Sequence, residues 1–377
     1  MTLSPAYAEY LRRMPKVDLH VHLTGTVRAE TFAELAEREG LQLPEPALDI
    51  YAKVNSRAKD LSIYRDAVLP VPTGPGHDEP EPSYGLFQVS QWVKQCLTNL
   101  GDYERIAYEA CENAATLSNT RHLELFFDPV ADTGTEFGYA ETVDAYIAGI
   151  QAAERDFGMT ARLVAGIDRS QSGEAAVERV RTVVDNPRAY VIGIGLDNLE
   201  TAGPPERFVD AYQLARAHGL RRTAHSSEHA PSAQNTIVCL DDLACDRIDH
   251  GYFILQDEAV VERCLADQVP FTCIFTTSRR AWRPWRRASI REMVGRGLKV
   301  TLASDDPGMF PTTLAQEYRI AAEELGFDRA TMRRLCLNGV DASWLPDDGR
   351  AALHRRFSAE LDDLEAELFA GAGTRDD

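Results

Sequence analysis

The sequence of 377 residues lacks several features that define whole classes of protein. No uninterrupted apolar run approaches the ~18 residues that a membrane-spanning helix needs, and residues 1–16 contain no signal-peptide core. The seven cysteines are odd in number and scattered, without a Cys-x-x-Cys pair. These absences argue against a membrane protein, a disulfide scaffold and a cysteine-ligated zinc site, and they predict a reduced cytoplasmic protein.

Basic residues are scarce as well. Lys and Arg total 40 against 59 Asp and Glu, which gives a formal net charge of −19. Nucleic-acid polymers and anionic membranes are bound through basic surfaces, so we expect neither as a partner. The net charge does not exclude a small anionic ligand. Lysine is especially rare, and none occurs between Lys94 and Lys299.

What the sequence contains instead is a repeated alternation of short apolar runs with longer helix-like stretches, such as 206–217 and 257–266. Alternating strands and helices indicate a parallel sheet, and eight such units fit an α/β fold of the (β/α)8 or TIM-barrel type. The eight apolar runs are 17–23, 122–127, 161–167, 191–196, 220–224, 247–248, 270–275 and 299–303.

We expect a single domain over residues 1–377, because a barrel needs about 250 residues and the surplus surrounds it. Most of the surplus lies at 24–121, after the first strand, and includes a Pro- and Gly-rich loop at 69–83. This insertion would be a lid over the barrel mouth, or else a surface excursion. Extra C-terminal helices are expected at 312–326, 329–339 and 350–368, before a frayed end at 371–377.

Metal-ligand residue types collect at the ends of the predicted strands. They are His20 and His22 on the first strand, His225 and His250 on the fifth and sixth, and Asp305 and Asp306 on the eighth. Two residues that lie two apart on a strand share a face. Taken singly, a His-x-His pair, a buried histidine or an Asp-Asp-Pro turn is weak evidence. Together these groups would be costly to bury without a purpose, and barrel active sites occupy these strand ends.

Zinc suits imidazole nitrogens combined with a carboxylate, and a catalytic zinc keeps a position open for the water that becomes the nucleophile. The predicted ligands are His20, His22, His225 and Asp305. Barrel hydrolases with two metal ions often bridge them with a carboxylated lysine on a middle strand. The lysine-free stretch described above leaves no such residue on strands 2 to 7, so we predict one Zn²⁺ per chain.

Four motifs carry these residues. They are Pro15-Lys-Val-Asp-Leu-His-Val-His-Leu23, His225-Ser-Ser-Glu228, Arg247-Ile-Asp-His-Gly251 and Ser304-Asp-Asp-Pro307. Together they resemble, in order and spacing, the motifs of the adenosine and adenine deaminases of the amidohydrolase superfamily. The resemblance extends over nearly the whole chain and implies the same barrel and the same metal ligands.

The resemblance also implies catalytic roles for three residues. Glu228, as a protonated acid, would donate to N1 of a purine and make C6 electrophilic. His250 would orient and help deprotonate the attacking water, and Asp306 would hold that water or the leaving amine. The alternative for Glu228 is a helix N-terminal carboxylate stabilised by the helix dipole, but its position three residues after the predicted ligand His225 favours a catalytic role.

The pocket residues differ from the family pattern. Thr24 stands where nucleoside enzymes carry an acidic residue for the sugar 5′-hydroxyl, Ser226-Ser227 replaces Ala-Gly, and Thr276-Thr277 replaces Ser-Asn or Ser-Ser. The stretches 125–129, 195–200, 247–251 and 342–346 resemble adenine deaminases, whereas 280–284 resembles the adenosine enzymes. The candidate substrate-binding residues are Thr24, Asp197, Asn198, Ser227, Arg279 and Arg280.

Five arginines interleaved with two tryptophans follow the seventh predicted strand, at positions 279, 280, 283, 286 and 287. Arginine forks suit carboxylate or phosphate. The cluster could therefore bind an anionic substituent of the substrate, or it could be a solvated helix face that balances acids or contacts another subunit.

The sequence thus predicts a zinc-dependent hydrolase of C–N bonds that deaminates C6 of adenine, adenosine or a derivative and releases ammonia. Its partner would be a small purine, anionic or not, and the chain could form a homodimer. One alternative is hydrolysis of an N6-substituted or non-purine amine. A more remote one is a binding protein that keeps the barrel without catalysis.

Overall fold

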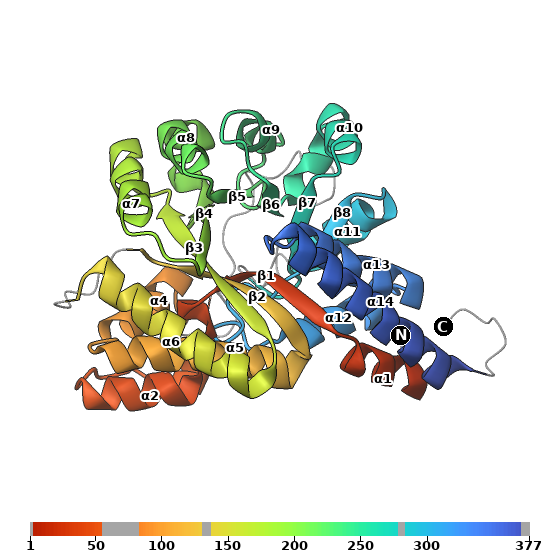
Figure 1. Ribbon diagram of the computed structural model, residues 1–377, viewed down its shortest axis with the longest axis horizontal. Helices are drawn as coiled ribbons and strands as arrows, with labels where there is room; N and C mark the ends of the chain where they lie inside the picture. The colour runs from red at the N-terminus through yellow and green to blue at the C-terminus, as the bar shows by residue number, and fades with distance from the viewer. Residues whose placement is uncertain (1–2, 55–82, 130–136, 278–282, 371–377) are drawn as a thin grey trace.

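The computed structural model describes residues 3–54, 83–129, 137–277 and 283–370. Within these residues, eight parallel strands pair in sequence order from β1 to β8 (Figure 1). Their bounds are β1 Lys16–His22, β2 Thr120–Phe127, β3 Thr160–Asp168, β4 Val191–Asp197, β5 Arg221–Ser226, β6 Arg247–His250, β7 Pro270–Cys273 and β8 Lys299–Leu302. All eight coincide with the predicted apolar runs.

The barrel closes where β1 meets the segment after β8. A parallel bridge pairs Val21 with Asp305. The Asp305 amide donates to the His20 carbonyl at 2.9 Å, and the His22 amide donates to the Asp305 carbonyl at 2.8 Å. The (β/α)8 prediction is confirmed, and the closure places the first and last predicted metal ligands side by side.

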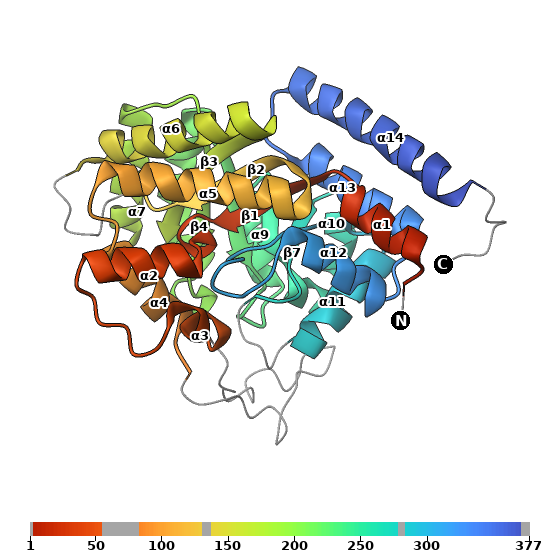
Figure 2. The same cartoon turned by 90° about the horizontal axis from the view of Figure 1, so that it is seen from below.

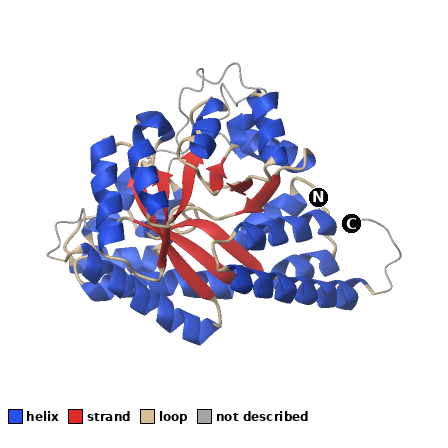
Figure 3. Cartoon of the chain, turned by 45° about the horizontal axis from the view of Figure 1, so that its top comes forward, coloured by secondary structure: helices blue, strands red, loops and turns tan. Residues whose placement is uncertain are grey.

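Helices surround the sheet, as Figure 3 shows in blue. Between the strands and at the chain ends they are α1 Pro5–Arg13, α2 Ala29–Arg38, α3 Ala47–Ala52, α4 Leu86–Gln95, α5 Leu100–Ser118, α6 Tyr139–Phe157, α7 Gly173–Asp185, α8 Val209–Ala217, α9 Gln234–Asp241, α10 Glu258–Ala266, α11 Arg283–Gly295, α12 Leu314–Glu323, α13 Arg329–Ala342 and α14 Asp347–Phe369. Short 3-10 helices follow β1, β4 and β6: η1 Thr24–Thr26, η3 Glu200–Ala202, η4 Pro205–Phe208 and η5 Tyr252–Gln256.

The insertion after β1 comprises η1 and helices α2 to α5. Figure 2 shows α2, α3 and α4 grouped on one side of the barrel. Lys94 of α4 forms an ion pair with Asp128, just after β2, at 2.6 Å, which ties this group to the C-terminal end of the barrel. Most of the loop predicted at 69–83 lies outside the described residues.

The three predicted C-terminal helices are present as α12, α13 and α14. Helix α13 packs directly on the barrel, because Gly339 gives it close contact: a Cβ there would lie 2.5 Å from the Val17 side chain. Helix α14 lies along α1, where Arg13 and Glu367 form a bidentate pair at 2.6 and 2.8 Å. The chain ends thus cover the β1–β8 side of the barrel.

A buried ion pair lies inside the barrel. Arg247 of β6 pairs with Glu124 of β2, and both side chains are fully buried. Arg247 also donates to the Leu19 carbonyl at 2.7 Å and stacks on the Trp344 ring at 3.9 Å. The Trp344 amide donates to the second Glu124 oxygen at 2.6 Å. These contacts join β1, β2, β6 and the end of α13.

Among the described helices, none has both the length and the apolar composition that a bilayer crossing requires.

Candidate metal centre and active site

Four side chains converge at the C-terminal ends of β1, β5 and β8. They are His20, His22, His225 and Asp305, and one potential ligand atom of each lies within 4.8 Å of all the others. The Nε2 atom of His225 is 3.0 Å from that of His20 and 3.1 Å from that of His22. Asp305 Oδ1 is 3.4 Å from His22 Nε2. Imidazole nitrogens that face one another beside a carboxylate form a ligand set for a divalent metal ion.

Local backbone structure produces this convergence. Asp305 adopts a positive φ of 61°, which turns the chain sharply at the end of β8. Thr277, just after β7, donates to Asp305 Oδ2 at 2.6 Å and leaves Oδ1 facing the histidines. The Thr276-Thr277 departure from the family pattern therefore preserves a donor that orients a ligand carboxylate.

A second layer of residues fixes the histidine rings. Thr272 lies 3.0 Å from His20 Nδ1 and donates its own proton to Asp249 at 2.8 Å. The threonine oxygen must then accept from Nδ1, which leaves the His20 Nε2 lone pair directed at the centre. Asp249 is also 3.5 Å from His225 Nδ1. Burial lowers the pKa of both His20 and His225 well below the ordinary value, which favours the neutral, metal-binding forms.

An aromatic ring closes one side of the cluster. The Phe126 ring centroid is 5.4 Å from that of His20 and 4.9 Å from that of His22. Gly195 of β4 permits this position, because a Cβ there would lie 2.2 Å from the Phe126 ring. The resulting wall is apolar, so it limits solvent around the metal ligands.

Glu228 lies beside the cluster, in contact with two histidines and a buried arginine. Its Oε2 is 2.8 Å from His229 Nδ1 and 3.5 Å from His250 Nε2, and its Oε1 is 3.6 Å from Arg286 Nη2. Burial alone would raise the pKa of Glu228, but its contacts with these three neighbours outweigh burial and lower the pKa below the ordinary value. The surroundings therefore favour the ionised carboxylate in the absence of substrate, whereas the family resemblance implies a protonated acid.

His250 connects Glu228 to the metal ligands. Its ring centroid is 4.9 Å from those of both His20 and His225, and its Nδ1 lies 3.2 Å from the Tyr252 hydroxyl. Within the described part of the chain, the buried Nε2 atom has no hydrogen-bond partner. Burial lowers the pKa of His250, so the neutral ring has a nitrogen available as a base.

Asp306 is buried against η1. Burial, followed by the charge of Asp305, raises the pKa of Asp306 well above its ordinary value. Its carboxyl rests on Gly25, where an added Cβ would lie 2.0 Å from Oδ1. The backbone after Asp306 is held by the same turn, because the Gly308 amide donates to the Gly25 carbonyl at 2.8 Å.

The candidate substrate-binding residues fall into three groups: those that follow β1 or lie at the end of β4, those outside the described residues, and Ser227. Asp197 is buried near His22, and burial raises the pKa of Asp197 to about 7. Asn198 has a positive φ of 67° and donates to Asp197 at 3.3 Å. Thr24 is half-buried in η1, two residues after His22. Arg279 and Arg280 lie outside the described residues.

Ser227, another candidate substrate-binding residue, lies in the turn before Glu228. Its hydroxyl is fully buried and turned into the loop, where it bonds to the Ser232 carbonyl and the Thr236 hydroxyl, each at 2.9 Å. Its φ is +53°, in the left-handed region that favours glycine. Ser227 therefore shapes the turn that carries Glu228, and its side chain is engaged away from the metal ligands.

The described arginines of the cluster after β7 bind protein groups. Arg283 donates to the Thr276 carbonyl at 2.9 Å, and Arg287 pairs with Glu324. Arg286 is fully buried, donates to the Thr277 carbonyl and faces Glu228. Sequence patterning did not indicate that Arg286 turns inward, because it lies among other arginines in an apparently solvated run.

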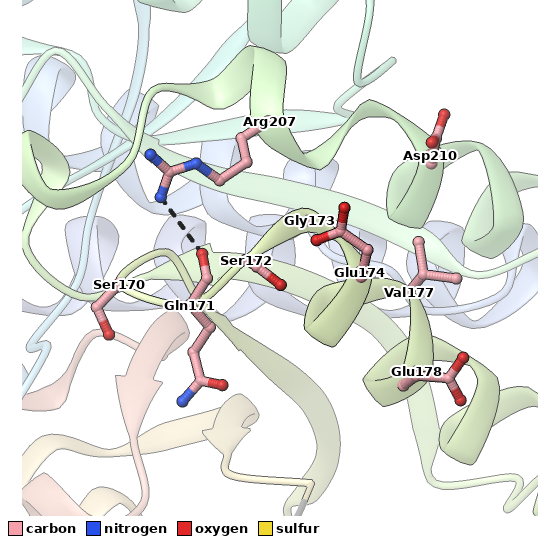
Figure 4. A pocket seen from close by; sticks show the side chains of 9 residues that line it. All are labelled: Ser170, Gln171, Ser172, Gly173, Glu174, Val177, Glu178, Arg207 and Asp210. Atoms are coloured by element: carbon pink, nitrogen blue, oxygen red, sulfur yellow. Dashed lines mark hydrogen bonds between the residues drawn. The ribbon is translucent and has the colours of Figure 1, made fainter.

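A separate groove of about 740 Å³ lies beside α7 and contains none of these residues (Figure 4). Its lining residues are Ser170, Gln171, Ser172, Gly173, Glu174, Val177, Glu178, Arg207 and Asp210. Arg207 is already bonded to the Gln171 carbonyl at 3.3 Å. The groove is thus distinct from the metal centre.

A parallel barrel with a His/His/His/Asp cluster at its C-terminal end, faced by a carboxylate and a histidine, is typical of metal-dependent hydrolases. More particularly, the chain belongs to the adenosine deaminase family, whose model matches residues 15–69 and 80–359.

Individual relatives agree with this assignment. Adenine deaminases from Ralstonia nicotianae and Rhodospirillum rubrum are each 31% identical, over 93% and 95% of this chain and 96% and 99% of theirs. A solved cog1816 amidohydrolase from Burkholderia ambifaria with bound Zn is 32% identical, with a TM-score of 0.85 over 98% of this chain and 96% of that one. An adenine deaminase structure from Arthrobacter aurescens is 28% identical, with a TM-score of 0.79 over 93% and 99%.

Proposed function

We propose that the protein is a zinc-dependent aminohydrolase that replaces the C6 amino group of an adenine-type purine by oxygen and releases ammonia. The observation that carries this proposal is the placement of Glu228 and His250 together, 3.5 Å apart, beside the four metal ligands. The relatives named adenine deaminase support an adenine-type substrate.

The ligand set fits a single zinc ion. Three imidazoles and one carboxylate would hold it and leave a position for water, and the burial that keeps the rings neutral also favours binding. The bound ion supplies a Lewis acid that lowers the pKa of a water molecule at the centre. The residues around the ion would then accept and donate the protons of that water.

His250 is the base in this proposal. Its neutral Nε2 takes a proton from the water that attacks C6, and its ring is held by Tyr252. Asp306, next to the candidate metal ligand Asp305, holds the attacking water or the departing amine. In the balanced reaction, the water oxygen ends on C6, one water proton ends on N1 and the other leaves with ammonia.

Glu228 is the acid that donates to N1 of the purine ring in this proposal. Entry of a purine ring removes water from the buried carboxylate, and this desolvation raises its pKa toward the protonated state. The acid then donates a hydrogen bond to N1, which draws electron density from C6. In this proposal Glu228 is ionised in the free protein and takes up its proton when the substrate binds.

The residue at position 24 favours a base over a nucleoside as the substrate. Thr24 offers a hydroxyl where a carboxylate would bind a sugar, and Asp197 with Asn198 would line the purine edge at the end of β4.

The test is a spectrophotometric screen for loss of the C6 amine, with metal analysis of the same sample. The panel contains adenine, adenosine, N6-substituted adenines and phosphate-bearing derivatives, because Arg279 and Arg280 would favour an anionic group. We expect about one zinc per chain and the highest kcat/KM with a free base. Zinc-loaded protein that releases no amine from any member would contradict the proposal, and protein that binds no zinc would point to the non-catalytic alternative.

Asp306 can be tested through the residue that it rests on. We expect Gly25→Ala to lower kcat by about 100-fold, because the new methyl group must displace the Asp306 carboxyl. Steady-state kinetics with metal-saturated protein measures this effect. Gly295→Ala is the matched control, because a Cβ there has no neighbour within 4 Å among the described residues. Equal kcat in the two variants would exclude the assigned position of Asp306 in the reaction.

A further inference from the structure

One buried carboxylate holds the turn that carries Glu228. Glu200, in η3 after β4, is only 2% exposed. Its two oxygens accept from four successive backbone amides, those of Ser227 at 2.7 Å, Glu228 at 2.8 Å, His229 at 2.8 Å and Ala230 at 2.9 Å. The Asn235 side-chain amide adds a fifth donor at 3.1 Å.

The geometry of the turn makes this contact possible. The left-handed conformation of Ser227 lets successive amides point into one concavity, an arrangement that binds anions. The five donors named above are all uncharged amides, so the carboxylate is held by backbone geometry. Backbone amides that lost this acceptor would be left buried, which is costly.

We propose that Glu200 is a positioning residue that fixes the reach of Glu228 toward the substrate ring, an inference that rests on the proposed function. Glu228 lies within the turn, so its backbone moves wherever the turn moves. Glu200 comes from the loop after β4, which also bears Asp197 and Asn198. The contact therefore sets the distance between the acid and the other candidate purine-binding residues.

His225 is held by groups other than the Glu200 carboxylate, although Arg169 also donates to the Glu200 backbone carbonyl at 3.4 Å. The His225 carbonyl accepts from Arg169, and the His225 ring faces Asp249. Loss of the Glu200 carboxylate should therefore release the turn while the metal ion stays bound. This separation distinguishes positioning from a general role in folding.

The substitution Glu200→Gln tests the proposal, because it keeps the side-chain volume but replaces one acceptor oxygen by a donor that faces the amides. We expect hydrogen exchange in the peptide covering 225–233 to rise at least about tenfold. We also expect kcat to fall by about 10–100-fold, with KM changed by less than about threefold and zinc content unchanged. If Glu200→Gln does not fold, Glu200→Asp keeps the charge but shortens the reach, and should show the same changes at smaller size.

Glu154→Gln is the matched control. Glu154 on α6 accepts from the Ala161 amide at 3.1 Å and from the Tyr190 hydroxyl at 2.7 Å, far from the metal ligands in the barrel. The Glu154→Gln variant should leave both kcat and hydrogen exchange at 225–233 unchanged. The proposal is overturned if Glu200→Gln leaves exchange at 225–233 unchanged, if kcat is unchanged despite faster exchange, or if zinc is lost in parallel with activity. Hydrogen exchange can be measured without turnover. An inactive wild-type protein would therefore contradict the proposed function, while the exchange result would still test whether Glu200 holds the turn at 227–230.

Discussion

Replacing Glu228 by glutamine should lower kcat by about 10²–10⁴-fold while the protein keeps its metal ion. Glutamine preserves the shape of the side chain but cannot exchange a proton with N1 of the ring. Glu228 is not among the four converging ligands, and it lies 3.5 Å from His250 rather than against the metal cluster. The loss should therefore fall on the chemical step rather than on metal binding or folding.

Single-turnover kinetics at saturating substrate, together with zinc analysis, measures this effect. Glu262→Gln on the exposed surface of α10 is the control for the same chemical change and should leave kcat within about twofold. Near-normal turnover by Glu228→Gln would exclude Glu228 as a catalytic residue. Loss of zinc in that variant would instead place the residue in the metal site.

Much of the metal centre was readable from the sequence because its signals are local. His20 and His22 share a face through strand alternation, and His225 and Asp305 follow apolar runs directly. A parallel barrel then brings its strand ends together, whatever the details of the loops. The convergence of these four ligands needed only the order of strands and the periodicity of each.

The supporting residues could not be found in this way, because their partners are distant in the sequence. Glu200 meets backbone amides nearly thirty residues later, at 227–230, and backbone groups have no sequence signature. Arg286 appears in a run of charges, and only the packing of α11 turns its guanidinium toward Glu228. The left-handed φ of Ser227 and the engagement of its hydroxyl within the loop likewise depend on the folded turn.

The buried pair inside the barrel should have the largest effect on stability. We expect Arg247→Met to lower the free energy of unfolding by about 3–5 kcal/mol, because it leaves the Glu124 carboxylate buried without its positive partner. Urea denaturation at neutral pH measures the change as a lower midpoint. Arg181→Met is the control, because its pair with Glu178 is exposed, with side chains 52% and 67% accessible, and should cost less than about 1 kcal/mol.

The pH dependence of the Arg247→Met effect distinguishes a lost charge from lost packing. In the wild-type protein, burial raises the pKa of Glu124, but the charge of Arg247, together with contacts from His122 and the Trp344 amide, outweighs burial and holds the pKa below the ordinary value. This stabilisation is present above the unfolded pKa and is lost as pH falls through the folded one. Without Arg247, its lowering of the folded pKa is lost and that pKa rises, so the variant should recover stability relative to wild type as the pH falls and Glu124 takes up a proton. If the loss of unfolding free energy in Arg247→Met stays constant with pH, the loss comes from packing alone and not from the missing charge.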